Sequence, residues 1–332
     1  MSSGGDNLLN VLRLKMYHRI RKGLFGRPLY IKAVDDVDLY VKRGESIAII
    51  GESGSGKTTL GKTILRLHEP LDGQILFDGW DITHIKGKEL KKYRRSTGLI
   101  QQDPYGALPP FMNIRRILEE PLKIHKVGNK VERLERIYKA LEDVRLTPVE
   151  DFINKYPHML SGGQQQRVVI ARSLILDPKL IVADEPVSML DASVRIEILR
   201  LLDSLQKKYN LSIIYISHDL STTKYFSQRI YIMYGGKLVE GGPTKEIIRN
   251  PLHPYTKYLI NALPDPDPGN RYVIRDVPPG EPPSLINPPR GCRFHPRCPL
   301  IIKGKCDSED PKYTYIADNR YVKCWYYEEG NG

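Results

Sequence analysis

A glycine-rich segment at residues 51–58 carries the clearest chemical signal in the sequence. Its letters, GESGSGKT, match the pattern G-x-x-x-x-G-K-[ST]. Glycines let successive backbone N–H groups point toward a β-phosphate, and a helix that starts here adds partial positive charge. Lys57 would reach the β- and γ-phosphates, and the Thr58 hydroxyl would ligate Mg²⁺. We predict a nucleoside triphosphate site rather than a strand–helix turn that binds nothing.

Two acids, Asp184 and Glu185, end the apolar run at residues 180–183. Side chains alternate along a strand, so these two carboxylates cannot share one task. One can support the Mg²⁺ shell, while the other orients or deprotonates a water that attacks the γ-phosphate. Acids in this position often cap a helix instead, and Pro186 would suit a helix start. Behind a phosphate loop in the same sheet, we predict that they are catalytic.

Two further polar side chains become candidate site residues because the sequence also contains the phosphate loop and the acid pair. His218 follows a predicted strand at residues 211–217, where an imidazole would contact the γ-phosphate and sense its loss. Gln102 follows the apolar run at residues 98–100 and would contact Mg²⁺ or the attacking water. Either residue alone would indicate nothing.

An aromatic ring that stacks on adenine is expected near the start of the second strand. Tyr30 holds that place, with Phe25 and Tyr17 as rivals. A plain packing role for Tyr30 stays open.

These residues need a sheet to position them, and the hydrophobic pattern of the sequence predicts a sheet. Alternation from Leu12 to Met16 favours a half-buried strand, and residues 34–41 a second one. The run at residues 46–50 lacks alternation, which is typical of a strand covered on both faces. We also expect helices at residues 57–67 and 192–209, a helical segment at 103–172, strands at 180–183 and 212–216, and a hairpin at 231–240. This order predicts a mostly parallel α/β sheet with a helical insertion.

Composition narrows the class of protein. The 332 residues make roughly two domains, and 40% hydrophobic with 27% charged residues excludes a disordered or fibrous chain. The net charge of +12 favours polyanionic partners, but the basic residues are spread out and no nucleic acid partner is expected. No apolar run approaches the ~20 residues of a membrane span, and the start lacks the pattern of a secretion signal. We therefore expect a soluble, cytosolic chain.

A second glycine-rich helix start, LSGGQ at residues 160–164, lies between the phosphate loop and the acid pair. By chemistry alone it is an anion site or a helix cap. In this position it is the signature of the ATP-binding-cassette family. The ordered set of GESGSGKT, Gln102, LSGGQ, LIVADE, SMLD and His218 resembles that family over about residues 8–251.

The resemblance implies an α/β fold of the P-loop NTPase (RecA-like) type. An ATPase domain would span residues 1–250, with a helical subdomain at about 103–172 and an antiparallel β subdomain. A C-terminal extension would follow at residues 251–332. Met189 stands where alanine is commoner in the family, a departure that we expect to be tolerated.

The resemblance also implies the role of each site residue. Glu185 would be the general base and His218 would contact the γ-phosphate. Asp184, Thr58 and Gln102 would support Mg²⁺, and Gln102 would couple the site to membrane subunits. The signature would bind ATP held by an opposite subunit, so that two sites form at a dimer interface. The residues expected to bind nucleotide are Tyr30, Gly51, Ser53, Gly54, Ser55, Gly56, Lys57, Thr58, Thr59, Ser161, Gly162, Gly163, Gln164 and Asp191.

Several longer segments resemble the oligopeptide/dipeptide importer branch, closest to the second of its two ATPase subunits. They are KGLF at 22–25, QDPYG at 102–106, YPHM at 156–159, NPLHPYT at 250–256 and NPPRGCRFHPRC at 287–298. The resemblance implies an ATPase on the cytoplasmic face of the membrane that powers uptake of oligopeptides or dipeptides. Its partners would be a related ATPase subunit, two permease subunits and, indirectly, a solute-binding protein.

Two alternatives remain at this stage. The same branch also imports di- and oligosaccharides, and the solute is not readable from this chain. A cassette ATPase of DNA repair or translation is less favoured, because those carry a long coiled-coil insertion or two cassettes. Here Lys57 and Ser161 are only 104 residues apart, and no second phosphate loop exists.

The C-terminal extension differs in composition from the rest. Fourteen of the 25 prolines lie between Pro251 and Pro311, so residues 264–289 are expected to be extended. The cysteines, spaced C-x5-C-x7-C-x17-C, are not the close pairs of common zinc sites, and disulfides are disfavoured in the cytosol. They are Cys292, Cys298, Cys306 and Cys324. The branch resemblance implies a 4Fe–4S cluster, with zinc, disulfides or free thiols as alternatives.

Overall fold

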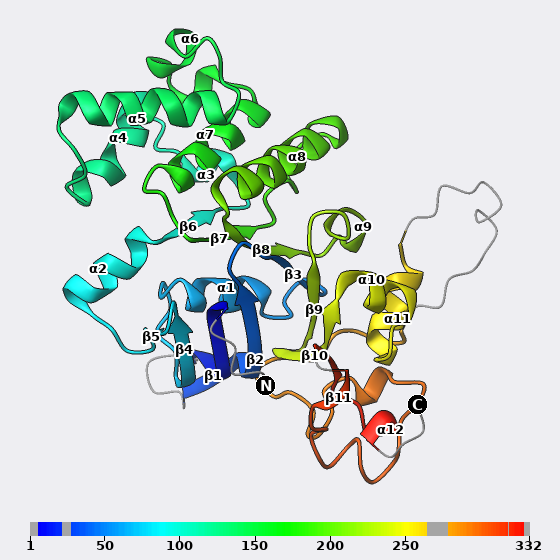
Figure 1. Ribbon diagram of the computed structural model, residues 1–332. Helices are drawn as coiled ribbons and strands as arrows, with labels where there is room; N and C mark the ends of the chain where they lie inside the picture. The colour runs from blue at the N-terminus through cyan, green and yellow to red at the C-terminus, as the bar shows by residue number, and fades with distance from the viewer. Residues whose placement is uncertain (1–5, 22–27, 264–277, 318, 329–332) are drawn as a thin grey trace. The chain divides into compact units, whose positions relative to one another are not determined.

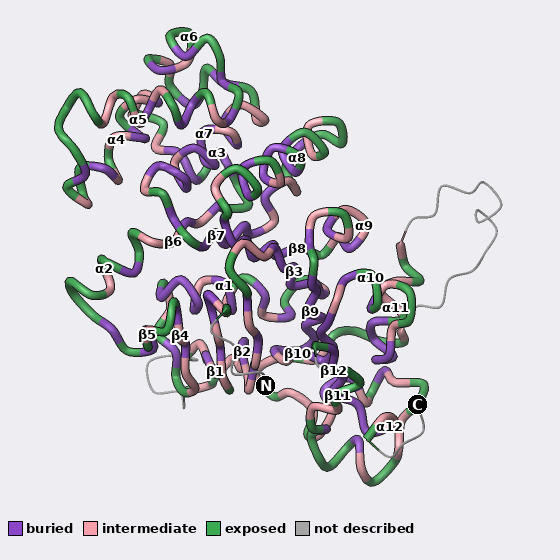
Figure 2. The backbone as a smooth tube through the Cα atoms, in the orientation of Figure 1, coloured by how far each residue is buried: buried purple, intermediate pink, exposed green. Residues whose placement is uncertain are grey.

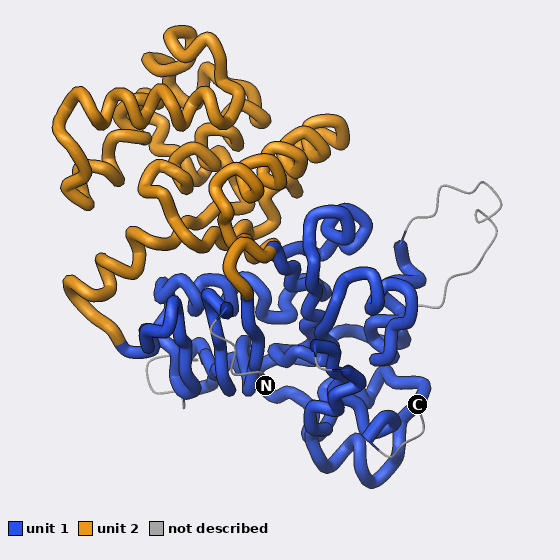
Figure 3. The backbone as a smooth tube through the Cα atoms, in the orientation of Figure 1, with its two compact units in different colours: residues 1–41, 46–84, 216–332 blue, residues 42–45, 85–215 orange. Residues whose placement is uncertain are grey.

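The computed structural model describes residues 6–21, 28–263, 278–317 and 319–328 (Figure 1). The KGLF segment with Phe25, and the predicted extended segment before residue 278, lie outside these residues. The chain divides into two compact units (Figure 3): unit 1 is residues 1–41, 46–84 and 216–332, and unit 2 is residues 42–45 and 85–215. In the part of the chain that the structure describes, no helix has the length and apolar character to cross a membrane.

Unit 1 contains a four-stranded antiparallel sheet in the order β2-β1-β4-β5. Its strands are β1 (Asn7–Arg21), β2 (Pro28–Lys42), β4 (Asp72–Phe77) and β5 (Trp80–Asp81). Strands β1 and β4 pair with Leu9 opposite Phe77. The predicted strands near residues 12–16 and 34–41 are confirmed as parts of β1 and β2, whereas β4 and β5 were not predicted.

A second sheet includes five strands of unit 1, in the order β11-β12-β10-β9-β3. These strands are β3 (Ser46–Ile50), β9 (Arg229–Tyr234), β10 (Lys237–Pro243), β11 (Thr314–Ala317) and β12 (Arg320–Val322). Strands β3 and β9 are parallel, and all residues of β3 are buried (Figure 2), as its unbroken apolar run predicted. The β9–β10 hairpin is confirmed, with Tyr234 opposite Lys237.

The described helices of unit 1 include α10, which packs against β9 and β10, and three elements of the C-terminal extension, α11, η3 and α12. They are α1 (Lys57–Ile64), α9 (Leu220–Thr223), α10 (Thr244–Arg249), α11 (Pro254–Asn261), the 3-10 turn η3 (His295–Arg297) and α12 (Trp325–Glu328). Helix α1 ends three residues before the predicted Leu67. The cause is Arg66, whose φ of 55° lies in the left-handed region and cannot continue a helix.

Unit 2 is mostly helical around a parallel pair of strands, β6 (Thr97–Ile100) and β7 (Leu180–Asp184), with β8 (Ser212–Ser217) beside β7. Its helices are α2 (Gly87–Arg95), α3 (Pro104–Ala107), α4 (Ile114–Ile124), α5 (Lys130–Asp143), α6 (Glu150–Ile153), η1 (Pro157–Met159), α7 (Gly162–Leu174) and α8 (Ala192–Tyr209). The helical insertion is confirmed as α3 to α7. Helix α7 packs against α3, α4 and α5, which explains its buried residues Val168–Ala171.

Candidate nucleotide-binding site

The loop between β3 and α1 has a backbone that only glycine suits. Gly54 and Gly56 have φ values of 75° and 106°, in the left-handed region. A Cβ at Gly56 would lie 1.9 Å from the carbonyl oxygen of Ala33, and one at Gly51 would lie 2.1 Å from that of Met233. The glycines of the predicted phosphate loop are therefore required both for its path and for its packing.

Lys57 is buried, with 5% of its surface exposed, and its side chain turns back over the loop. Its Nζ donates to the carbonyl oxygens of Gly51 (2.7 Å) and Glu52 (2.8 Å). The buried Ser55 hydroxyl has no hydrogen-bond partner among the described residues. Leaving such a group unsatisfied costs about 1–3 kcal/mol, and a phosphate oxygen would accept from it. A cation, an orphaned hydroxyl and a glycine cradle together fit a bound triphosphate.

The aromatic candidates differ in how they are engaged. Tyr30, on β2, is 46% exposed. The Tyr17 hydroxyl donates to Asp35 Oδ1 at 2.6 Å, and Lys32 lies over the Tyr17 ring. Burial, aided by the Asp35 carboxylate, raises the pKa of Tyr17. Tyr17 is thus held by its own neighbours, which leaves Tyr30 as the described candidate for adenine stacking.

His218 lies one residue beyond β8 and is exposed. The next residue, Asp219, caps α9 by accepting from the Ser221 backbone N–H at 2.8 Å. The predicted place of His218 at the end of a strand is therefore correct, and a structured turn follows it.

In unit 2, the predicted catalytic residues Gln102 and Glu185 are in contact. The Gln102 side-chain amide donates to Glu185 Oε2 at 3.1 Å. Asp184 is the last residue of β7 and is buried. Glu185 follows with a φ of 45°, a left-handed conformation that is rare for glutamate. We expected strand alternation to point the two carboxylates in opposite directions, but Glu185 lies beyond the end of β7, so a turn after the strand sets its conformation.

The LSGGQ segment starts helix α7 and caps it. The Ser161 hydroxyl accepts from the Gln164 backbone N–H (3.3 Å), and Gln164 Oε1 accepts from the Ser161 N–H (3.0 Å). This reciprocal pair is a capping box. Ser161 is exposed, and a Cβ at Gly163 would lie 2.8 Å from the Val194 side chain. The predicted cap is therefore present, and it leaves the helix N-terminus accessible.

Asp191, the last predicted nucleotide-binding residue, occupies the N-cap position of α8. Its side chain makes no capping hydrogen bond and is exposed. A capping role therefore does not account for this carboxylate.

The four cysteines of the extension are free thiols whose sulfurs interact electrostatically. Burial, followed by the neighbouring cysteines, raises the pKa of Cys292 to about 12 and that of Cys298 to about 11. Each of the four sulfurs accepts a backbone N–H, the donors being Phe294, Leu300, Ile302 and Tyr326. Within the described ranges, no three or more His, Cys, Asp or Glu side chains are grouped so that they could hold a metal ion.

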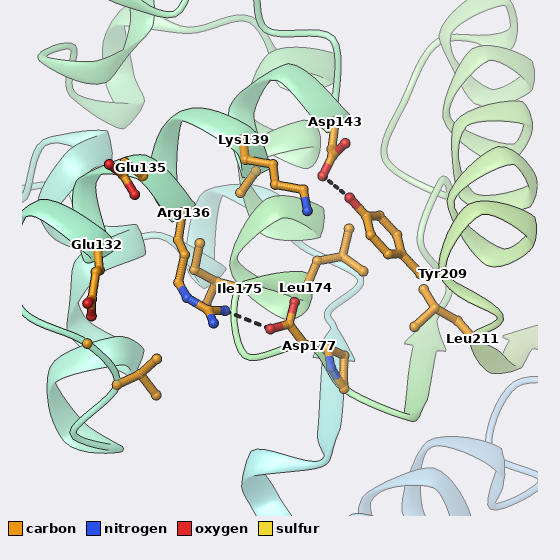
Figure 4. Close-up of a pocket in the computed structure, with 14 residues that line it drawn as sticks. Glu132, Glu135, Arg136, Lys139, Asp143, Leu174, Ile175, Asp177, Tyr209 and Leu211 are labelled. Carbon is orange, nitrogen blue, oxygen red and sulfur yellow. Dashed lines mark hydrogen bonds and ion pairs between the residues drawn. The ribbon is translucent and has the colours of Figure 1, made fainter.

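A cavity of about 530 Å³ in unit 2 contains none of the predicted site residues (Figure 4). Two pairs of its lining residues are in contact: Arg136 forms an ion pair with Asp177 at 2.6 Å, and the Tyr209 hydroxyl donates to Asp143 at 2.5 Å. Leu174 contributes to its apolar lining. These pairs join α5 to the ends of α7 and α8, and we assign the cavity no role.

Two residues that sequence reasoning missed lie beside the phosphate loop. Arg297 and Tyr255 of the extension both hydrogen-bond to Glu52. They fall inside the HPRC and HPYT stretches, whose branch resemblance was the only signal that could have drawn attention to them.

Comparisons with known proteins match both halves of the chain. Residues 34–188 match the family "ABC transporter", and residues 239–306 match the family "Oligopeptide/dipeptide transporter, C-terminal region". The chain is 42% identical to the oligopeptide transport ATP-binding protein AppF of Bacillus subtilis, over 97% of this chain and 98% of that protein. It is 41% identical to the dipeptide transport ATP-binding protein DppF of Haemophilus influenzae, over 96% of each.

Among solved structures, the chain is similar to the ATP-binding cassette MJ0796, a dimer in a post-hydrolysis state with ADP and phosphate. The TM-score is 0.62 at 30% identity, over 71% of this chain and 98% of that one. It is also similar to CbiO1 of Clostridium perfringens, part of an ABC transporter complex. There the TM-score is 0.63 at 29% identity, over 74% of this chain and 92% of that one.

Proposed function

This chain belongs to the oligopeptide/dipeptide branch of the ABC-transporter ATPases, and from that premise we propose that it hydrolyses ATP at a dimer interface to power peptide import. Its fold is the mixed α/β P-loop fold of these ATPases with the C-terminal region of that branch. The observation that carries the proposal is the phosphate loop, in which a buried lysine and an orphaned hydroxyl lie in a glycine cradle.

Lys57 binds the β- and γ-phosphates in this proposal. Its Nζ exchanges the carbonyl oxygens of Gly51 and Glu52 for phosphate oxygens, which bear more charge. Thr58, exposed in the first turn of α1, and Asp184, at the end of β7, support Mg²⁺. Mg²⁺ neutralises charge on the transferred phosphoryl group.

Glu185 acts as the general base for the attacking water. The Gln102 amide donates to its Oε2 and so fixes the orientation of the carboxylate. Gln102 also reports the state of this site to the membrane subunits, and His218 contacts the γ-phosphate. The exposed N-terminus of α7, with Ser161, and the exposed Asp191 serve the nucleotide of the opposite subunit.

We further propose a 4Fe–4S cluster on the four cysteines. Their sulfurs interact electrostatically, and the backbone N–H donors to Cys292, Cys298 and Cys324 oppose the larger rise in pKa that burial causes in these three thiols. A zinc ion would need all four sulfurs about 2.3 Å from one centre, whereas each thiolate of a 4Fe–4S cluster ligates a different iron. Iron and sulfide analysis of protein purified without oxygen tests this, and a colourless, iron-free preparation would overturn it.

The assembled transporter would contain this subunit, a related ATPase subunit and two permease subunits, with a solute-binding protein outside the membrane. The subunit would lie on the cytoplasmic face. We propose an ATPase domain at residues 1–250, with its helical subdomain at about 103–172, and an extension at residues 251–332. Di- or oligosaccharides are the alternative solute.

The test is Lys57→Ala in the complete transporter reconstituted in vesicles, with ATP turnover and uptake of labelled di- and tripeptides as readouts. We expect turnover to fall at least ~100-fold, because an electrostatic clamp on phosphate is lost. Lys62→Ala, on the same helix, is the matched control. Unchanged turnover and uptake in Lys57→Ala would refute the proposal. If the transporter takes up a disaccharide but no peptide, the proposed solute is wrong and a disaccharide takes its place.

A further inference from the structure

Glu52, the second residue of the phosphate loop, is held by the C-terminal extension. Its backbone N–H donates to the Tyr255 hydroxyl at 2.9 Å. One oxygen of its carboxylate accepts from Arg297 Nη1 at 3.3 Å. Its carbonyl oxygen accepts from Lys57 Nζ at 2.8 Å and from the Ser55 N–H at 3.2 Å. One residue therefore connects the extension to the lysine that binds phosphate.

Both residues of the extension that contact Glu52 are themselves fixed. Tyr255 is fully buried, and its ring centroid lies 4.6 Å from that of Tyr234. Arg297 is 8% exposed, and it also donates to the Tyr234 hydroxyl (3.3 Å) and to the Pro279 carbonyl oxygen (3.0 Å). A guanidinium with several acceptors loses little further freedom when it binds one more. It therefore presents an oriented positive charge to Glu52.

The segment that carries Arg297 is anchored to the ATPase domain by the two residues that follow Cys292. Arg293 forms an ion pair with Asp35 and donates to the Gly235 carbonyl oxygen. Phe294 is buried against aromatic rings of the domain and of α11. Arg297 directly precedes Cys298. The four-cysteine region thus reaches the phosphate loop through a short, rigid segment.

We propose that Arg297 and Tyr255 are positioning residues through which the four-cysteine extension sets the affinity of the phosphate loop for ATP. When phosphate binds, Lys57 Nζ leaves the carbonyl oxygen of Glu52. The loop then keeps the backbone conformation that receives phosphate only if Glu52 stays in place. Without these contacts, part of the binding free energy is spent on ordering the loop. The inference rests on the proposed ATP site and adds two residues that act on the nucleotide through Glu52.

The main experiment measures ATP affinity of the full chain by displacement of a fluorescent ATP analogue, and KM and kcat in the assembled transporter. In Arg297→Ala we expect Kd and KM to rise ~10-fold, the scale of one charge-assisted hydrogen bond, with kcat at saturating ATP changed less than about twofold. Arg297→Lys should recover part of the affinity for ATP, because lysine keeps the positive charge but lacks the several fixed N–H donors of a guanidinium. Arg290→Ala, an exposed arginine of the same extension, is the matched control.

A second variant guards against misfolding of Arg297→Ala. Glu52→Gln preserves the shape of the loop and weakens only the ion pair, so its KM should rise about 3- to 10-fold. Once Glu52 is neutral, adding Arg297→Ala should raise KM little further. Tyr255→Phe should also raise KM, because the Glu52 N–H loses its acceptor.

The outcomes separate this inference from the proposed function. If Arg297→Ala and Glu52→Gln match Arg290→Ala in Kd and KM while Lys57→Ala is inactive, the positioning role is refuted and the ATP site stands. Fully additive effects of Arg297→Ala and Glu52→Gln would also refute it. If Lys57→Ala itself retains normal turnover, the proposed ATP site fails first.

Discussion

Replacing Phe294 with alanine is expected to loosen the C-terminal extension while the strand pairing of β12 stays intact. The Phe294 side chain is 1% exposed, and its ring centroid lies 5.1 Å from that of Tyr234 and 5.6 Å from that of Tyr255. Removing such a ring from a core costs about 3–5 kcal/mol. At ~1.4 kcal/mol for each factor of ten, the lower figure increases local opening roughly 100-fold.

Hydrogen exchange of the full chain, followed by mass spectrometry of its peptides, measures this opening. Peptides from residues 290–310 should exchange about 100-fold faster in Phe294→Ala. Peptides from β12 should change little, because Val322 pairs with Glu240 of β10 independently of the ring. Phe294→Leu should cost below about 1.5 kcal/mol and so accelerate exchange at most ~10-fold. Leu300→Ala, 39% exposed in the same segment, serves as control.

Two results would contradict this reasoning. Unchanged protection at residues 290–310 in Phe294→Ala would mean that the ring does not anchor the extension. Equal acceleration at residues 290–310 and in β12 would mean that the extension opens as one body. In the second case, the contact between Arg297 and Glu52 would depend on β12 as much as on Phe294.

Two further predictions concern catalysis and pH. Glu185→Gln should lower hydrolysis by about 10²- to 10⁴-fold in a single-turnover assay while ATP still binds, because glutamine can accept from Gln102; normal turnover would exclude Glu185 as base. Burial lowers the pKa of His253 to about 3 from an ordinary 6.5, while its Nδ1 accepts from the Tyr255 N–H at 3.1 Å. Between these values the unfolded chain binds more protons, so stability should fall as pH drops below ~6.5, by up to about 1.4 kcal/mol per pH unit. Urea midpoints at pH 7 and pH 5 measure this slope, and His253→Asn should reduce it; an equal slope in that variant would assign the dependence elsewhere.

Sequence predicted those parts of the fold whose signals are contiguous. Strand β3, the phosphate loop and the β9–β10 hairpin follow from an unbroken apolar run, a glycine pattern and a Gly-Gly turn. Helix α8 has the predicted bounds, Ala192–Tyr209. In each case neighbouring residues decide the local structure, and tertiary packing agrees with them.

Several of the features that sequence missed depend on few residues or on distant ones. Strands β5 and β12 have only two and three residues, too few for a recognisable alternation. The contact of Arg297 with Glu52 joins residues 245 positions apart. No local pattern encodes such a pair, although each partner lies in a segment that was noticed for another reason.

The conformation of Glu185 shows how the site depends on packing that lies outside its motifs. A left-handed φ costs a glutamate about 1–3 kcal/mol, so the surrounding structure must impose it. The Glu185 carbonyl accepts from both the N–H and the hydroxyl of Ser188, at 3.2 and 3.1 Å. The next carbonyl, of Pro186, accepts at 2.7 Å from the side-chain amide of Gln166, a fully buried residue of α7. Helix α7 begins within the LSGGQ signature. A shift of this helix would therefore move the turn that positions Glu185, because the hydrogen bond from Gln166 to the Pro186 carbonyl connects the two.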